Sequence, residues 1–292
     1  MSEKKRPWLG SLALALAAAI WGSAFVAQRV GMEYNEPFTF NAVRCCIGSL
    51  ALVPVSLIFP PKPGKERRST LLGGLLCGLS LFFATNLQQI GLVDTDAGKA
   101  GFITTFYIVL VPILGLFQGK KCGKTTWLAV LIALAGLYFL CMGSGSVHLQ
   151  RSDLLLLLCA LFYSLQILLV DRFIPKADTV RMSCVQFAIC GVLSLIPAFA
   201  LETPRVENLA LGIIPLLYAG LLSCGIAYTM QIIGQQHLRP TVASLLMSLE
   251  SAFAVLSGWL ILHEHLSGRE LLGCGLMFTA ILLVQLWPQK EM

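Results

Sequence analysis

The fold is decided by stretches such as residues 152–170, which read SDLLLLLCALFYSLQILLV. Between Asp153 and Asp171 no residue is charged, and about 20 such residues form a helix that crosses the hydrocarbon core of a bilayer. Similar runs fill the whole chain: 57% of its 292 residues are hydrophobic, 12% are charged and the mean hydropathy is +0.79. A soluble domain carries about 25% charged residues. The composition therefore excludes an ordinary soluble enzyme, a disordered chain and a nucleic-acid-binding protein.

The apolar runs predict an all-α integral membrane protein with ten transmembrane helices. Helices are expected because a lipid environment cannot satisfy the hydrogen bonds of an open backbone. The predicted spans are residues 8–29, 37–58, 70–90, 97–117, 124–142, 152–170, 180–200, 211–231, 240–262 and 270–287.

The Lys and Arg residues predict how these spans are oriented. Fifteen of the 21 fall in segments on the side of the N-terminus, five fall on the opposite side, and Arg44 lies inside a span. Cytoplasmic loops are enriched in Lys and Arg. We therefore expect a multi-pass protein of the cytoplasmic membrane, with both its N- and C-termini in the cytoplasm.

The two halves of the chain resemble each other at a constant offset of 143 residues. This shift aligns Gly48 with Gly191, Pro54 with Pro197, Gln88 with Gln231, and Gly91 with Gly234. Each half holds five predicted spans, and because five is odd the second half must enter the membrane in the opposite sense. The pattern predicts two inverted five-helix repeats, residues 1–145 and 146–292, joined by a Gly/Ser linker. Inverted repeats are typical of transporters that expose a central site to each side in turn.

Five short motifs recur along the chain, namely Trp21–Phe25, Phe40–Arg44, Ala97–Thr104 with Tyr107 and Pro112, Ser248–Phe253, and His263–Ser267 before Gly273. Together they resemble the motifs of the EamA family, in the drug/metabolite transporter superfamily. The chain departs from the family pattern at Ser251, where a proline is common, and at Lys120, where an acidic residue is common. The resemblance implies ten helices in two inverted bundles that move small organic solutes.

Two ionisable residues at membrane depth are candidate substrate-binding groups, since such residues are costly in lipid and mark functional sites. Arg44 has a planar, permanently charged guanidinium that suits a carboxylate or phosphate of a solute. Glu250 is predicted to lie near the midplane, where a carboxyl group can exchange protons during transport. It is therefore also the proton-coupling candidate. The alternative is that Arg44 and Glu250 form an ion pair that only stabilises the bundle.

Four further residues are candidates for lining a solute cavity, namely Trp21, Thr104, Tyr107 and Tyr163. The aromatic residues offer an apolar face with a polar atom, although ordinary helix packing is the more common role of such residues. The remaining intramembrane polar residues, among them Gln88, Gln166, Tyr228 and Gln231, are expected to bond between helices rather than to solute.

The sequence lacks the motifs of other functions. We find no phosphate-binding loop, dinucleotide fingerprint, nucleophile elbow or zinc-protease motif, and the ten cysteines lack metal-binding spacing. We therefore predict no catalytic residue, no metal, no cofactor and no enzyme activity. The expected partners are a small-molecule solute and the lipid bilayer but no nucleic acid, and the protein is a monomer or a homodimer.

The function that these patterns favour is secondary transport. The solutes would be small polar or amphiphilic metabolites, such as amino acids or related compounds, moved by alternating access. Pro54, Pro112 and Pro197 are candidate bending points within the spans. Proton coupling through Glu250 is a further hypothesis. The alternative function is a carrier of multidrug cations or of lipid-linked solutes, resembling a flippase.

Overall fold

The computed structural model describes residues 6–61, 63–94, 97–120, 122–141, 150–262 and 267–286, and these are helical with no strand. The first half holds α1 (Pro7–Gly31), α2 (Pro37–Ile58), α3 (Arg67–Val93), α4 (Ala97–Thr104), α5 (Tyr107–Phe117) and α6 (Lys124–Cys141). The second half holds α7 (Arg151–Phe173), α8 (Thr179–Leu201), α9 (Val206–Leu211), α10 (Ile213–Leu217), the π-helix η1 (Tyr218–Ala227), α11 (Tyr228–His237), α12 (Pro240–Met247), α13 (Leu249–Leu262) and α14 (Gly268–Leu286). The Gly/Ser linker and the predicted boundary between residues 145 and 146 lie outside the described residues, as does His263–Leu266 of the fifth motif.

The helices have the length and composition of membrane spans. Within the described residues, eight are long and apolar enough to cross a bilayer, and Lys124–Phe139 is a shorter apolar helix. Large apolar side chains such as Phe117, Leu57 and Ile214 are more than three-quarters exposed, as expected for a surface that faces lipid rather than water. The all-helical membrane fold is confirmed, whereas the count of ten spans, with α14 as the tenth, stays a prediction.

Two of the spans are interrupted at equivalent places in the two halves. The break between α4 and α5 falls at Thr105, and the break between α12 and α13 falls at Ser248, which is the same position after the shift of 143 residues. At each break a hydroxyl group bonds back to the preceding turn: Thr105 donates to the Gly101 carbonyl at 2.6 Å and Ser248 to the Leu245 carbonyl at 2.7 Å. Such bonds compete with the backbone pattern of the helix. Discontinuous helices of this kind surround the central site of many inverted-repeat transporters.

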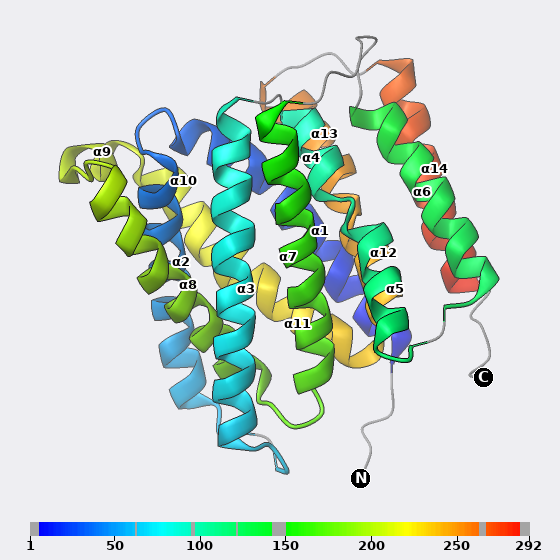
Figure 1. Ribbon diagram of the computed structural model, residues 1–292, viewed down its shortest axis with the longest axis horizontal. Helices are drawn as coiled ribbons and strands as arrows, with labels where there is room; N and C mark the ends of the chain where they lie inside the picture. Colours follow the sequence, from blue (N-terminus) through cyan, green and yellow to red (C-terminus); the bar gives the residue numbers. More distant parts are fainter. Residues whose placement is uncertain are drawn as a thin grey trace.

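The packing of the helices maps each half onto the other. α2 packs against α8, and α6 packs against α14, which are the pairs that the shift equates. The α6–α14 pair forms one edge of the molecule, and the α2–α8 pair lies at the opposite side (Figure 1). α3 of the first half packs on α7, and its equivalents η1 and α11 pack on α1, the equivalent of α7. In the same way α1 packs on α13, and its equivalent α7 packs on α5, the equivalent of α13. This exchange of contacts is what a pseudo-two-fold axis between two repeats requires.

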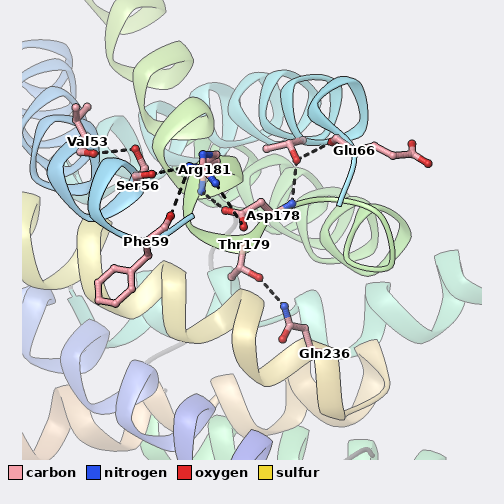
Figure 2. A network of polar contacts seen from close by, with 9 residues as sticks. Val53, Ser56, Phe59, Glu66, Asp178, Thr179, Arg181 and Gln236 are labelled. Carbon is pink, nitrogen blue, oxygen red and sulfur yellow. Dashed lines mark hydrogen bonds and ion pairs between the residues drawn. The ribbon is translucent and has the colours of Figure 1, made fainter. Parts of the chain in front are cut away.

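Charged side chains of α8 and of the residue that follows it bond to both ends of α2. At one end Glu202 accepts hydrogen bonds from the backbone N–H groups of Phe38 and Thr39, at 2.8 and 2.7 Å. At the other end the Arg181 guanidinium donates to the carbonyl oxygen of Ser56 at 2.7 Å (Figure 2). The anion thus meets the positive end of the α2 dipole and the cation meets its negative end, which makes α2 and α8 a firmly joined pair.

The structure corrects several expected boundaries. The eighth span was expected at 211–231 but runs over Ile213–His237 as α10, η1 and α11, and the short α9 precedes it. The π-helix coincides with close packing on α2, because a Cβ atom on Gly220 would lie 2.6 Å from the Ile47 side chain.

Prolines do not mark the interruptions: α2, α5 and α8 continue through Pro54, Pro112 and Pro197.

Candidate functional site

A central cavity with a volume of about 50 Å³ lies between the two halves of the bundle. Its walls come from α1, α2, α3, α5, α7, α8, η1, α11, α12 and α13. The lining residues are Trp21, Phe25, Gln28, Arg44, Thr85, Gln88, Tyr107, Tyr163, Gln166, Ile167, Phe187, Ser223, Cys224, Tyr228, Gln231, Met247 and Glu250. Five of the six residues predicted from the sequence are therefore brought together.

Thr104 is the sixth predicted residue, and the structure places it elsewhere. It ends α4 just before the break, is 1% exposed and does not line the cavity. The direction of its side chain depends on how α4 is rotated about its axis, which the sequence does not specify. Tyr107, three residues later and after the interruption, does line the cavity.

Arg44 lies on α2, where that helix approaches η1 closely. A Cβ atom on Gly48 would lie 2.5 Å from the Cys224 side chain and 2.9 Å from the Gly220 carbonyl, so the glycine permits this approach. The guanidinium is 5.7 Å from the centre of the Phe40 ring, and its Nε has no hydrogen-bond partner among the described residues. Arg44 is thus a buried cation, only 4% exposed, at the wall of the cavity.

Glu250 is the second residue of α13, directly after the break. There the positive end of the helix dipole favours a carboxylate. The Tyr107 hydroxyl, at the start of α5, donates to Glu250 Oε1 at 3.0 Å. Tyr107 and Glu250 are separated by 143 residues, so one hydrogen bond joins equivalent positions of the two repeats. The neighbouring hydroxyls of Thr105 and Ser251 are also hydrogen-bonded, at 2.9 Å.

The two ionisable residues of the cavity do not pair with each other. In the part of the chain that the structure describes, no oppositely charged nitrogen and oxygen atoms of Arg44 and Glu250 come within 4.0 Å. The ion pair that the sequence left open as an alternative is therefore not formed. The two side chains instead line the cavity separately.

Aromatic rings form much of the remaining wall. Tyr228 packs edge-on against Trp21 and Phe187, with ring centres 4.7 and 5.0 Å apart. The Tyr163 hydroxyl donates to Gln88 Oε1 at 3.1 Å. The indole N–H of Trp21 has no partner among the residues described, so the wall offers an unused donor as well as apolar surface.

Glutamine side chains are the functional candidates that sequence reasoning undervalued. Gln88, Gln166 and Gln231 were assigned to bonding between helices. Gln231 does donate to Gln166 at 2.9 Å, but all three side chains also line the cavity. The available signal was the repeat itself, because the shift that places Gln88 on Gln231 marks both residues as equivalent positions around one axis.

Lys120, which departs from the family pattern, has a partner outside the cavity. Its ammonium bonds to the Asp171 carboxylate near the end of α7. The pair is about one-third exposed and links the end of the fourth span to the second repeat. The nine cysteines whose state is described are free thiols, and no His, Cys, Asp and Glu cluster among the described residues has the arrangement of a metal site.

Comparison with known proteins agrees with this architecture. The model of the EamA-like transporter family matches twice, over residues 8–142 and 150–286. The chain belongs to the EamA-like transporter family. An uncharacterized transporter of Archaeoglobus fulgidus is 30% identical over 94% of this chain and 85% of its own. The threonine/homoserine exporter RhtA of Escherichia coli is 27% identical over 99% of this chain and 96% of its own.

A solved crystal structure shares the fold of this EamA protein. It aligns with a TM-score of 0.80 over 95% of this chain and 98% of the other, at 17% sequence identity. Family membership and the apolar helices make the protein a multi-pass membrane transporter with two repeats. Its partners are accordingly a small-molecule solute and membrane lipid.

Proposed function

We propose that this EamA transporter carries small zwitterionic metabolites, amino acids or related compounds, across the cytoplasmic membrane by alternating access. The observation that carries the proposal is that Arg44 and Glu250 both line one cavity without forming an ion pair with each other. An α-carboxylate suits the guanidinium, and an α-ammonium group suits the carboxylate. Burying both charges of a zwitterion is affordable only where each meets an opposite charge.

The repeat architecture supports alternating access. The interrupted spans α4–α5 and α12–α13 meet at the cavity through the Tyr107–Glu250 hydrogen bond. A rocking of one repeat against the other would bend the molecule at these junctions. Because Glu250 takes part in the junction, its protonation would be coupled to the movement. The Lys and Arg distribution supports cytoplasmic termini, and the assembly as a monomer or homodimer stays a prediction.

Uptake into proteoliposomes tests the proposal. A mixed pool of amino acids and central metabolites is offered with and without an imposed pH gradient, and the imported solutes are identified by mass spectrometry. We expect saturable uptake of a few zwitterions, reduced at least tenfold by Arg44→Gln. The exposed residues Arg29 and Glu207 provide the matched controls Arg29→Gln and Glu207→Gln, which keep the wild-type rate. Failure of every zwitterion to enter above empty liposomes would contradict the proposal.

The same assay tests proton coupling. We expect Glu250→Gln to abolish the response to the pH gradient while a residual exchange of solute persists. An unchanged response in this variant would exclude Glu250 as the coupling group.

The aromatic walls and Glu250 favour a second candidate, which is transport of hydrophobic cations or lipid-linked groups. The fixed charge of Arg44 opposes this candidate. A cation bound at Glu250 would share the cavity with the Arg44 guanidinium, which is not paired with Glu250. Uptake of tetraphenylphosphonium that is lost in Glu250→Gln and increased in Arg44→Gln would favour this candidate over zwitterion transport.

A further inference from the structure

Gln166 of α7 and Gln231 of α11 form a buried amide pair at the cavity wall. Gln231 Nε2 donates to Gln166 Oε1 at 2.9 Å and to Gln235 Oε1 at 3.2 Å. Gln235 in turn donates to the backbone carbonyl of Ile167 at 3.0 Å, which anchors α11 to α7. Both Gln166 and Gln231 are 1% exposed, so their side chains are held in place rather than free in solvent.

This pair keeps one donor and one acceptor unused. Among the residues described, Gln166 Nε2 and Gln231 Oε1 have no hydrogen-bond partner, and both side chains line the cavity. The bond of Gln235 to the backbone fixes the assignment of the amide atoms. Because Gln235 Nε2 donates to the Ile167 carbonyl, Gln235 Oε1 accepts from Gln231 Nε2, and Gln231 Oε1 and Gln166 Nε2 remain the free acceptor and donor.

The amide pair lies at the opposite end of the cavity from Arg44. Gln231 is six residues from the end of α11 and Gln166 is seven from the end of α7, or about 10 Å from the face where α1 begins. Arg44 is about 10 Å from the other face, seven residues after the start of α2. Glu250 lies between these levels, ten residues into the span that begins at Pro240. The order along the cavity is cation, carboxylate and amide pair.

We propose that Gln166 and Gln231 are specificity-determining residues that bind the side chain of the transported amino acid and select a hydroxyl or carboxamide group. The inference rests on the proposed zwitterion transport: with the carboxylate at Arg44 and the ammonium at Glu250, the solute side chain points to the amide pair. A hydroxyl or a carboxamide both donates and accepts, and so satisfies both free atoms. An apolar side chain would leave both unpaired in a buried site, and a charged side chain would lack a counter-charge there.

A purely structural role is the competing interpretation, in which the glutamines only join α7 to α11. The two roles differ in a measurable way. Loss of a structural bond lowers transport of every solute alike, whereas loss of a side-chain subsite changes the ratio between solutes of equal size. Sites that hydrogen-bond a substrate hydroxyl discriminate strongly against the analogue without it.

The test compares threonine with valine in proteoliposomes, since these side chains differ by a hydroxyl in place of a methyl group. We expect wild-type protein to prefer threonine by about tenfold or more in kcat/KM, and asparagine over leucine in the same direction. Gln166→Met keeps the length of the side chain and removes its polar atoms, so it should bring the threonine/valine ratio close to one while valine transport persists.

Gln236→Met, on the same helix, is the matched control. It removes a hydrogen bond to the Thr179 hydroxyl at the start of α8 from a residue that does not line the central cavity, and it should leave the threonine/valine ratio unchanged. Equal transport of threonine and valine by the wild-type protein would overturn the side-chain subsite while leaving zwitterion transport intact. An equal change of the ratio in Gln166→Met and Gln236→Met would also overturn it. If no zwitterion is transported at all, the proposed function itself has failed.

Discussion

Replacing Gly22 with alanine tests how tightly the cavity helices are packed. A Cβ atom on Gly22 would lie 2.5 Å from Cβ of Phe253, and 2.7 Å from both the backbone nitrogen of Ala254 and the carbonyl oxygen of Glu250. None of these atoms can rotate away, because two belong to the backbone and the third is a Cβ. Ordinary contacts are about 3.5–4.0 Å, so α1 and α13 must separate by about 1 Å to admit the methyl group.

The expected cost follows from this overlap. Overpacking a well-packed interior costs about 1–3 kcal/mol, and alanine returns up to about 1 kcal/mol of helix propensity. Gly275→Ala on α14 is the matched control, because a Cβ atom there would meet nothing within 4 Å and only the propensity gain applies. The difference between Gly22→Ala and Gly275→Ala therefore isolates the packing cost of about 1–3 kcal/mol.

Thermal unfolding of the purified protein in detergent measures this difference. With roughly 2–4 °C of Tm per kcal/mol for chains of this order of size, Gly22→Ala should melt several degrees below Gly275→Ala. Since α1 carries Trp21 and α13 carries Glu250, the same separation should also lower kcat/KM for the transported solute. A Tm for Gly22→Ala equal to or above that of Gly275→Ala would refute close packing of α1 against α13.

Three further outcomes are expected from contacts outside Arg44 and the glutamine pair. Glu202→Ala removes the hydrogen-bond acceptor for the first backbone N–H groups of α2 and should lower the free energy of unfolding by about 1–2 kcal/mol in a denaturation assay. Glu207→Ala, at an exposed position, should have little effect in the same assay. Lys120→Glu places two carboxylates together and should lower Tm, and adding Asp171→Lys should recover most of the loss; failure to recover would argue against the pair. Tyr107→Phe removes the bond between the two interrupted spans and should change the pH dependence of uptake without preventing folding, so an unaltered pH profile would exclude this bond from coupling.

The helical membrane fold was predictable from sequence because hydropathy and length are one-dimensional properties. A run such as 152–170 can cross a bilayer only as a helix, and α7 spans Arg151–Phe173. The interruption at Thr105 was not predictable in the same way, because residues 100–117 contain no charged residue and the break coincides with a hydroxyl that bonds to its own helix. Proline does not mark this interruption, since α5 continues through Pro112.

The candidate site was only partly predictable. Membrane depth singled out Arg44 and Glu250, because burying an ionisable group is costly wherever its helix faces. Depth could not decide that Thr104 turns away from the cavity, nor that the Gln166–Gln231 pair faces it. Polar uncharged side chains are tolerated both between helices and in a cavity, so their residue type alone carries little information about which of the two they occupy.

The sequence by itself determined that this protein is a helical membrane transporter of two similar halves. The lengths of the apolar runs, the positions of the basic residues and the constant offset between the halves are properties of the chain that do not depend on any tertiary contact. Only the tertiary structure decided that Arg44 and Glu250 share one cavity without pairing, and that an amide pair completes its wall. The physical reason is that a membrane helix is apolar nearly all round, so hydropathy does not fix its rotation about its axis. That rotation is set by close contacts such as those at Gly22 and Gly48, which exist only once the helices are packed together.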